Sequence, residues 1–366
     1  MKQLESKEAG KAATESVNNP PDSETVSRTE PGLSAVITQG LTKKFGHFTA
    51  VNHVSLDVKY GEIFGFLGPN GAGKTTTILM LVTLITPSEG SAQVASHDIV
   101  DEPGRVREAI GYVSQDIAVD EYLTGRENLL VEGHLHHLKG AALDRSIDEV
   151  LQTVGMREWA NELVANYSGG MRRRLDIAGG LVHRPQILFL DEPTLGLDPQ
   201  TRSAIWEYIR RLNQQGLTIF LTTHYLDEAD ALCGRVAIMD QGEIKALDSP
   251  ENLKRSLGKD LVEILLHPTP PELRARFCEA VQELPNVAQS QRQDSKLVLR
   301  VTNVEHVIPE IFRISSSMGV GIDSISSKHP SLDDVFLALT GKALREERGD
   351  SWTARRTLER SRRART

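Results

Sequence analysis

The segment that most constrains the fold is the glycine-rich run from Gly68 to Thr76, Gly-Pro-Asn-Gly-Ala-Gly-Lys-Thr-Thr. It fits the pattern G-x-x-x-x-G-K-[ST], and it lies between a strand-like segment, Glu62 to Leu67, and a helical pattern that begins at Lys74. Glycines let backbone N–H groups turn inward around an anion, and the N-terminus of the following helix adds partial positive charge. A glycine-rich surface turn is the alternative, but the strand–loop–helix context favours a phosphate-binding loop.

The side chains of this loop suit a nucleotide and its metal ion. Lys74 supplies a full positive charge to the terminal phosphates of ATP, and the hydroxyl of Thr75 suits Mg²⁺ coordination. The backbone N–H groups of the loop form the rest of the cradle. The residues expected to contact nucleotide here are Gly68, Pro69, Asn70, Gly71, Ala72, Gly73, Lys74, Thr75 and Thr76.

A second candidate element is the apolar run from Ile187 to Leu190, which ends in Asp191 and Glu192. The run is typical of a strand buried in a parallel sheet, so both carboxylates emerge at its C-terminal end, where such sheets bind ligands. We expect Asp191 to hold Mg²⁺ through water and Glu192 to polarise the attacking water. An Asp-Glu-Pro turn without chemistry is the alternative, and the nearby phosphate loop makes it the weaker one.

The remaining patterns predict an α/β core with helices between the strands of a parallel sheet. Long helical patterns from about Asp116 to Val164, broken at Gly140, indicate a helical insert. Another helix is expected to follow the insert and to end at Pro185. His134, His136 and His137 cluster on the insert and are interpreted as a solvated face, because no cysteine or suitable carboxylate pattern accompanies them. Further strand-like runs are Val51–Val58, Ile110–Ser114, Gln186–Leu190, Thr218–Thr222 and Arg235–Met239.

Other patterns flank this core. Residues 1–34 contain no aromatic residue and are predicted to be a disordered tail. A compact split β-α-β-type accessory domain is predicted from about Asp260, closed by the segment from Pro330 to Gly341. Its strand-like runs are Leu261–Leu266, Leu297–Val301 and Gly321–Ser326, and its helical stretches are Pro271–Glu283 and Val304–Met318. The arginine-rich end, residues 345–366, is expected to be solvated and disordered, with anionic lipid binding as the alternative.

Composition narrows the class of partner. The formal net charge of −8 argues against nucleic acid as a partner, because nucleic-acid binders usually carry a strongly basic face. Cys233 and Cys278 are far apart and lack metal-ligand spacing, which favours a reducing compartment and no structural zinc. We find no run of about 18 apolar residues and no secretory signal, so we expect the chain to be made and kept in the cytoplasm.

One more motif, Tyr167-Ser168-Gly169-Gly170-Met171, precedes a helical segment. Ser168 suits the N-cap of that helix, while the two glycines behind it also expose backbone donors to an anion. With this motif the stretch from about Ala35 to Gly258 resembles the nucleotide-binding subunits of ATP-binding cassette transporters. The residues that carry the resemblance are, in order, the phosphate loop, Gln115, Ser168-Gly169-Gly170, Asp191-Glu192, Leu195-Gly-Leu-Asp198 and His224.

The resemblance implies a role for each matching residue. Phe45 falls where the family stacks an aromatic ring on adenine, although Tyr is more usual there. Gln115 matches the residue that senses the γ-phosphate and Mg²⁺, and His224 matches the switch that contacts the γ-phosphate. His224 also follows an apolar strand next to the acidic element, which favours chemistry over the structural role usual for a lone histidine.

The same resemblance implies that two copies of the chain share the nucleotide. Ser168, with Gly169 and Gly170, matches the signature that binds ATP held by the opposite subunit, and Asp198 matches a loop that crosses the dimer interface. A two-fold dimer then has two equivalent ATP sites. The implied fold is a P-loop ATPase domain over residues 35–258, with a helical subdomain at about 116–166, followed by a small α+β accessory domain over 260–344.

The segment from Pro330 to Gly341, Pro-Ser-Leu-Asp-Asp-Val-Phe-Leu-Ala-Leu-Thr-Gly, resembles the ending of ATPase subunits of daunorubicin-resistance drug exporters, whose membrane halves are separate chains of the ABC-2 class. The implied function is ATP hydrolysis that powers export of a drug, antibiotic or lipid-like substrate through a separate transmembrane permease. The implied location is the cytoplasmic face of the cell membrane. The alternative is a soluble cassette ATPase that acts on ribosomes or DNA, which a single cassette, the acidic balance and the lack of heptads disfavour.

Overall fold

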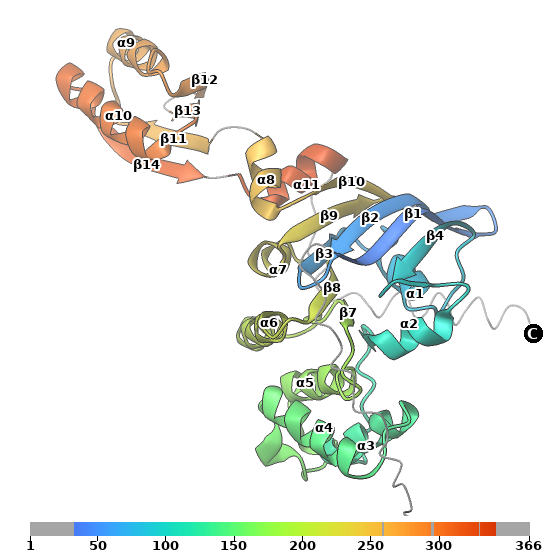
Figure 1. Ribbon diagram of the computed structural model, residues 1–366. Helices are drawn as coiled ribbons and strands as arrows, with labels where there is room; N and C mark the ends of the chain where they lie inside the picture. Colours follow the sequence, from blue (N-terminus) through green and yellow to red (C-terminus); the bar gives the residue numbers. More distant parts are fainter. Residues whose placement is uncertain (1–32, 258–259, 294–295, 329, 342–366) are drawn as a thin grey trace, which may run out of the picture.

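A six-stranded sheet in the order β10-β9-β3-β8-β7-β6 forms the centre of the molecule (Figure 1). The computed structural model describes residues 33–257, 260–293, 296–328 and 330–341. Neighbouring strands from β9 to β6 are parallel, and β10 is antiparallel to β9. The strands are β3 (Ile63–Leu67), β6 (Ile110–Val113), β7 (Ile187–Asp191), β8 (Thr218–Thr223), β9 (Arg235–Asp240) and β10 (Glu243–Asp248). The predicted strands of this sheet are confirmed to within one residue at each end.

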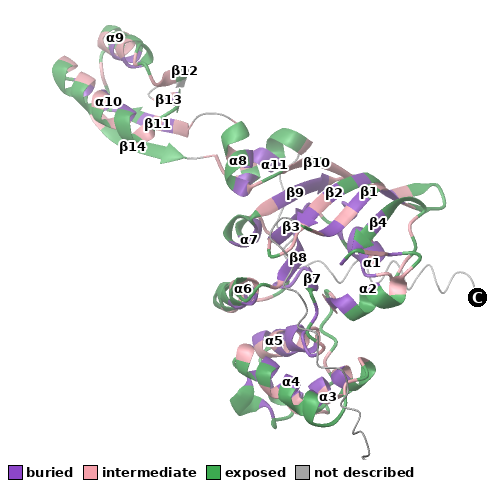
Figure 2. Ribbon diagram, viewed as in Figure 1, coloured by how far each residue is buried: buried purple, intermediate pink, exposed green. Residues whose placement is uncertain are grey.

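Layers cover both faces of this sheet, which explains why β3, β7 and β8 are buried at every residue (Figure 2). One face packs through a cluster of phenylalanine rings, with centroids 5.3 to 6.3 Å apart, of which Phe64, Phe189 and Phe220 are members. That face is covered by an antiparallel sheet and two helices. These are β1 (Ser34–Phe45), β2 (Phe48–Lys59), β4 (Glu89–Val94), β5 (His97–Asp98), α1 (Lys74–Leu81) and α2 (Pro103–Ala109). The predicted strand Val51–Val58 lies within β2, and β1 begins at the last residue of the predicted tail.

The helical insert is confirmed, and it shares a continuous core with the other face of the sheet. It contains α3 (Gly125–Leu135), α4 (Gly140–Thr153) and the short 3₁₀ turns η1 (Arg157–Trp159) and η2 (Val164–Asn166), and α5 (Gly169–Gly179) follows it. Residues 116–124, which were predicted to belong to the helical pattern, form no helix. The helices α6 (Pro199–Gln214) and α7 (Leu226–Leu232) lie between the later strands. Gly140 has φ +57° and is the first residue of α4, so the helical pattern breaks there as predicted.

The prediction that Pro185 ends the helix before it was wrong. Helix α5 ends at Gly179, and the chain tightens at once into turns in which Leu181 N–H donates to the Ala178 carbonyl. The physical reason is close packing against β6, because a Cβ added at Gly111 would lie 2.1 Å from the Gly180 carbonyl oxygen. The helix therefore ends where the chain packs closely against β6, before it reaches the proline.

The small domain has the element order β-α-β-β-α-β and an antiparallel sheet in the order β12-β13-β11-β14. Its elements are β11 (Asp260–Leu266), α9 (Pro271–Gln282), β12 (Val287–Gln293), β13 (Lys296–Val301), α10 (Val304–Met318) and β14 (Ile322–Lys328). Val262, Ile264 and Leu266 alternate with more exposed residues along β11 and pack with both helices in a separate core. The predicted strands and helices are confirmed, while the polar strand β12 was not predicted.

The last described helix, α11 (Leu332–Thr340), does not close the small domain as predicted. Leu332, Val335 and Phe336 are buried in the core of the large domain, beside Leu253 of α8 (Pro250–Ser256). Figure 1 shows the chain leaving the large domain after α8, forming the small domain and returning to place α11 next to α8. The apolar stripe on α11 was predicted correctly, but the spacing of apolar residues does not determine which domain core the helix packs against.

Two further predictions concern the tails of the chain and the lack of a membrane-spanning segment. The predicted tails lie outside the described residues, apart from Leu33 and Ser34. Within the described part of the chain, none of the helices has the length and apolar character needed to span a bilayer.

Candidate functional site

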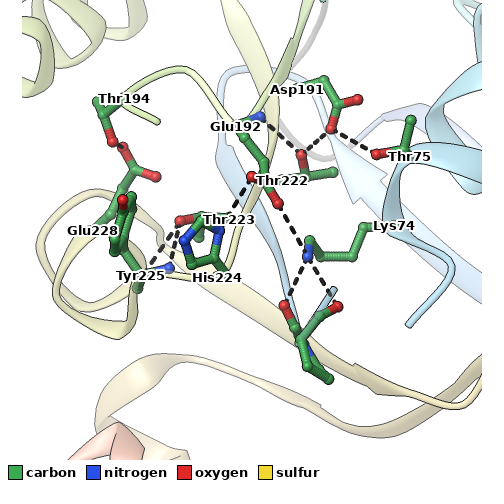
Figure 3. A network of polar contacts seen from close by, with 12 residues as sticks. Lys74, Thr75, Asp191, Glu192, Thr194, Thr222, Thr223, His224, Tyr225 and Glu228 are labelled. Carbon is green, nitrogen blue, oxygen red and sulfur yellow. Dashed lines mark hydrogen bonds and ion pairs between the residues drawn. The ribbon is translucent and has the colours of Figure 1, made fainter. Parts of the chain in front are cut away.

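The C-terminal ends of β3, β8, β7 and β6 meet along one edge of the central sheet, because these strands are adjacent and parallel. Each strand end carries part of the predicted site. The phosphate loop follows β3, Gln115 follows β6, Asp191 ends β7, and His224 follows β8. Figure 3 shows side chains from three of these strand ends joined in one polar network.

The phosphate loop is a tight turn that only glycine permits at key positions. Gly73 has φ +105°, and a Cβ there would lie 2.5 Å from the Ala50 carbonyl oxygen. Lys74, the first residue of α1, is 4% exposed, and its Nζ donates to the Gly68 carbonyl at 2.7 Å and to the Pro69 carbonyl at 3.2 Å. The loop therefore curls around its own lysine, and the ammonium group lies at the centre of the cradle.

Glu192 lies between this lysine and a histidine. One carboxylate oxygen is 3.2 Å from Lys74 Nζ, and the other is 3.1 Å from His224 Nδ1. Burial alone would raise the pKa of Glu192, but the hydrogen bond from His224 and the charge of Lys74 outweigh burial and lower that pKa. Glu192 also has φ +48°, a left-handed conformation that costs free energy for a residue with a side chain. Strain of this kind is typical of functional positions.

Asp191 has different surroundings from its neighbour. Its Oδ1 accepts hydrogen bonds from the hydroxyls of Thr75, at 3.3 Å, and of Thr222. Burial raises the pKa of Asp191, and the two hydroxyl donors offset only part of that effect. The Thr222 Oγ1 also accepts a hydrogen bond from the Glu192 N–H at 3.0 Å, so one threonine holds both acidic residues.

Thr222 was missed by sequence reasoning. A threonine at a strand end has no distinctive spacing, and its contact with Asp191 exists only because β8 lies directly beside β7. The one available signal was the pair of hydroxyl residues immediately before His224.

The donor set at Thr75 and Asp191 fits Mg²⁺. This ion usually binds one or two carboxylates, hydroxyl or water oxygens, and substrate phosphates, rather than a cage made of protein alone. Across the described residues, no group of three or more His, Cys, Asp or Glu side chains is arranged to hold a metal ion, which leaves the hydroxyl–carboxylate pair as the candidate.

The Ser-Gly-Gly motif is at a different place, at the start of α5. Ser168 is the N-cap of α5, and its Oγ accepts a hydrogen bond from the Met171 N–H at 3.3 Å. Gly170 packs on α6, where a Cβ would lie 2.4 Å from the Thr201 methyl group. Asp198 caps α6 and accepts hydrogen bonds from Thr201. Ser168, Gly169, Gly170 and Asp198 therefore lie close together, outside the polar network of Figure 3.

Two predicted nucleotide contacts lie at the periphery. Phe45, at the end of β1, is 52% exposed, and its ring faces the Lys43 ammonium at 5.2 Å. Gln115 is exposed, and within the described part of the chain its side chain makes no hydrogen bond to Thr75 or Asp191.

A groove of about 330 Å³ lies between the core and the helical insert. Its lining includes Leu84, Leu129, Glu132, His136 and His183. The reading of the insert histidines as a solvated face was wrong for His136, which is half-buried and stacks on the His183 ring with centroids 3.6 Å apart. Burial lowers the pKa of His183 to about 4, so the stacked pair is uncharged near neutral pH. The other two histidines are exposed.

A parallel sheet that carries a phosphate loop, a buried lysine and two strand-end carboxylates defines a P-loop nucleotide-hydrolysing protein. Comparison with known proteins identifies the family. Residues 51–195 match the model of the ABC transporter family, and residues 249–340 match the model of the C-terminal domain of DrrA1-3-like ATP-binding proteins.

The chain is 40% identical to the daunorubicin resistance ATP-binding protein DrrA2 of Streptomyces coeruleorubidus, over 84% of this chain and 95% of that protein. It is 35% identical to the linearmycin resistance ATP-binding protein LnrL of Bacillus subtilis, over 84% and 99%. Among solved structures, it resembles the dimeric post-hydrolysis state of the cassette MJ0796 bound to ADP and Pi, with 28% identity and a TM-score of 0.53 over 58% of this chain and 98% of that one.

The chain belongs to the ATP-binding cassette family, as an ATP-binding protein of the daunorubicin-resistance type. It is therefore an ATPase subunit of an exporter, and the fold class predicted from the sequence is confirmed. The relatives support the transport interpretation rather than the alternative of a soluble ATPase acting on ribosomes or DNA.

Proposed function

We propose that two copies of this chain bind Mg²⁺-ATP between them and drive export through a separate membrane permease. The observation that carries the proposal is the position of Glu192, whose carboxylate lies between Lys74 and His224 at the open edge of the parallel sheet. A carboxylate beside the phosphate-binding lysine is well placed to accept a proton from water that attacks the terminal phosphate.

Different residues around Glu192 bind different parts of the nucleotide and its metal ion. Lys74 and the backbone of residues 68–76 bind the β- and γ-phosphates, and the exposed ring of Phe45 stacks on adenine. Thr75 and Asp191, together with Gln115, are the residues that would hold Mg²⁺. When bound, Mg²⁺ supplies positive charge that offsets the charge of the phosphate oxygens.

The ion pair between Lys74 and Glu192 gives the site a defined resting state. The phosphates of ATP compete for the lysine and replace the carboxylate as its partner. Glu192 is then free to act on water, while His224 keeps the carboxylate in place through its hydrogen bond. Because the pKa of Glu192 is lowered, the carboxylate is ionised and ready to accept a proton near neutral pH.

The second half of each site comes from a partner copy. Ser168, Gly170 and Asp198 lie together at the starts of α5 and α6, and Figure 1 shows α5 beside the insert helices rather than beside α1. A two-fold axis places the Ser168 face of each copy over the Lys74 of the other, which produces two equal sites.

The groove between the core and the insert is the proposed permease contact. Its walls come from α2, β6, α3 and α5, so a permease segment seated there touches both the core and the helical insert. Contact with a permease places the chain at the cytoplasmic face of the membrane. The resistance to daunorubicin or linearmycin in the relatives' names supports a drug, an antibiotic or a lipid-like compound as cargo.

The test is Glu192→Gln, which keeps the shape of the side chain and removes the base. We expect ATP binding to persist, turnover to fall by about 10²- to 10⁴-fold, and ATP-bound dimers to accumulate in size-exclusion chromatography. The matched control is Glu263→Gln, which changes an exposed ion pair with Lys296 in the small domain and leaves turnover unaltered. Unchanged hydrolysis in Glu192→Gln would refute the assignment of the base.

A further inference from the structure

A buried arginine outside the predicted site holds the strand end that carries both carboxylates. Arg173 of α5 is 3% exposed. Its Nε donates to the Pro193 carbonyl at 2.8 Å, and its Nη2 donates to the Asp191 and Glu192 carbonyls, both at 3.2 Å. Three consecutive backbone carbonyls at the end of β7 are therefore bound by one guanidinium group.

The remaining nitrogen of the guanidinium reaches the loop that carries Gln115. Nη1 donates to the Ser114 carbonyl at 2.7 Å and to the Asp176 carboxylate at 3.0 Å. The other oxygen of Asp176 accepts a hydrogen bond from the Ala118 N–H at 3.3 Å. The Arg173–Asp176 pair thus binds the backbone on both sides of Gln115, one residue before it and three residues after it.

All five N–H donors of Arg173 are used in this arrangement, and four of the five acceptors are backbone carbonyls of residues in or next to the ATP site. A lysine has the same charge but only three donors on one nitrogen, so it cannot reach these acceptors together. A buried ion pair alone often adds little net stability compared with apolar packing, which leaves the geometry of these bonds as its distinctive effect.

We propose that Arg173 and Asp176 form a positioning pair that couples the two ATP sites of the dimer. Ser168, the N-cap of α5, faces the partner's nucleotide in the proposed ATP sandwich, and Arg173 follows within about 8 Å along the helix axis. A displacement of α5 when Ser168 binds the partner's ATP is therefore transmitted to Glu192 and to the Gln115 loop of the same chain. The proposal rests on the two-copy arrangement proposed above.

The test is Arg173→Lys in the full-length protein. Because Lys74 and the phosphate loop are untouched, we expect the Kd for ATP and the binding stoichiometry to stay within about twofold of the original. Loss of the guanidinium hydrogen bonds misplaces Glu192 and Gln115, so kcat is expected to fall by about ten- to a hundredfold. The matched control, Arg184→Lys, alters an exposed ion pair with Glu149 and leaves kcat and Kd unchanged. A role in folding alone predicts instead that kcat and the bound ATP fall in proportion, and that result would overturn the proposal, as would an unchanged kcat.

A second variant keeps the proposal testable if Arg173→Lys does not fold. Asp176→Asn retains an oxygen for the Ala118 N–H and removes the charge that orients the guanidinium, so the same separation of kcat from Kd is expected. In the Glu192→Gln background, either change weakens ATP-driven dimer formation at least tenfold. If Glu192→Gln alone forms no dimers, the proposed ATP sandwich fails. If it forms dimers and both added changes leave them intact, the coupling role of Arg173 fails while the sandwich stands.

Discussion

At the scale of single residues, one hydroxyl group connects two adjacent acidic residues whose side chains have different surroundings. Thr222 donates to the Asp191 carboxylate and accepts from the Glu192 N–H. Asp191 is held by hydroxyls and has a raised pKa, whereas Glu192 is held by Lys74 and His224 and has a lowered one. Adjacent carboxylates therefore acquire separate roles from their neighbours, and Thr222 keeps them in register.

Replacing Thr222 with valine tests this connection. Removal of the hydroxyl is expected to cost about 1–3 kcal/mol of stability and to reduce kcat about tenfold. Because the hydroxyl lowers the pKa of Asp191, its loss raises that pKa further, and the acid limb of the kcat/KM profile should move to higher pH. Thr218→Val is the control, since it removes a buried hydroxyl that accepts from the Gly61 N–H at the other end of β8. A control variant that shifts the acid limb equally would contradict the assignment.

At the scale of elements, α11 links the small domain to the large one. The chain between α8 and α11 folds into the small domain, and both helices pack together at the edge of the cassette. The apolar side chains of α11 contribute to the core that also contains Leu253 of α8 and the central sheet. The cassette is therefore completed by a helix that lies far along the chain from its other elements.

Phe336→Ala measures this contribution. Phe336 is 2% exposed, so the truncation is expected to destabilise the large domain by about 3–5 kcal/mol. Tryptophan fluorescence in urea reports on that domain when it is measured in a Trp352→Phe background, because the two remaining tryptophans, Trp159 and Trp206, both lie in the large domain. The neighbouring variant Leu337→Ala, at a position 48% exposed, should change the midpoint little. An unaltered midpoint in Phe336→Ala would show that α11 does not support the cassette.

At the scale of the whole molecule, the proposed permease contact is separate from the ATP site and from the small domain. The groove lies between the core and the insert, whereas the small domain extends from the opposite end of the central sheet (Figure 1). The groove lining includes Ser114 and Asp176, which belong to the hydrogen-bond network of Arg173. Changes at the other groove residues are therefore expected to affect coupling without affecting nucleotide chemistry.

Leu84→Asp tests the groove. Leu84 is 58% exposed and lines the groove, so a carboxylate there should not disturb folding but should weaken an apolar contact with a permease. We expect co-purification with the permease to fall at least tenfold and basal ATPase activity to stay within about twofold. Leu265→Asp, on an exposed face of the small domain, is the control. If only the control lost the permease, the contact would belong to the small domain.

Features that depend on residues close together in the sequence were predicted well, and features that depend on distant contacts were not. The phosphate loop, the strand ending at Asp191 and the helical insert depend on local patterns, and all were predicted at nearly the right residues. The strand β1, the place of α11, the end of α5 and the stacking of His136 depend on distant contacts, and these were missed or wrong.

The amino-acid sequence by itself determined the conformation of the phosphate loop and the alternation of strands and helices, because glycine freedom and hydrophobic periodicity act over a few residues. Only the tertiary structure decided that β8 lies between β3 and β7, which brings Thr222 to Asp191 and His224 to Glu192. It also decided that Arg173 is buried against the end of β7. Strand order and burial follow from packing across the whole core, and no short segment carries that information.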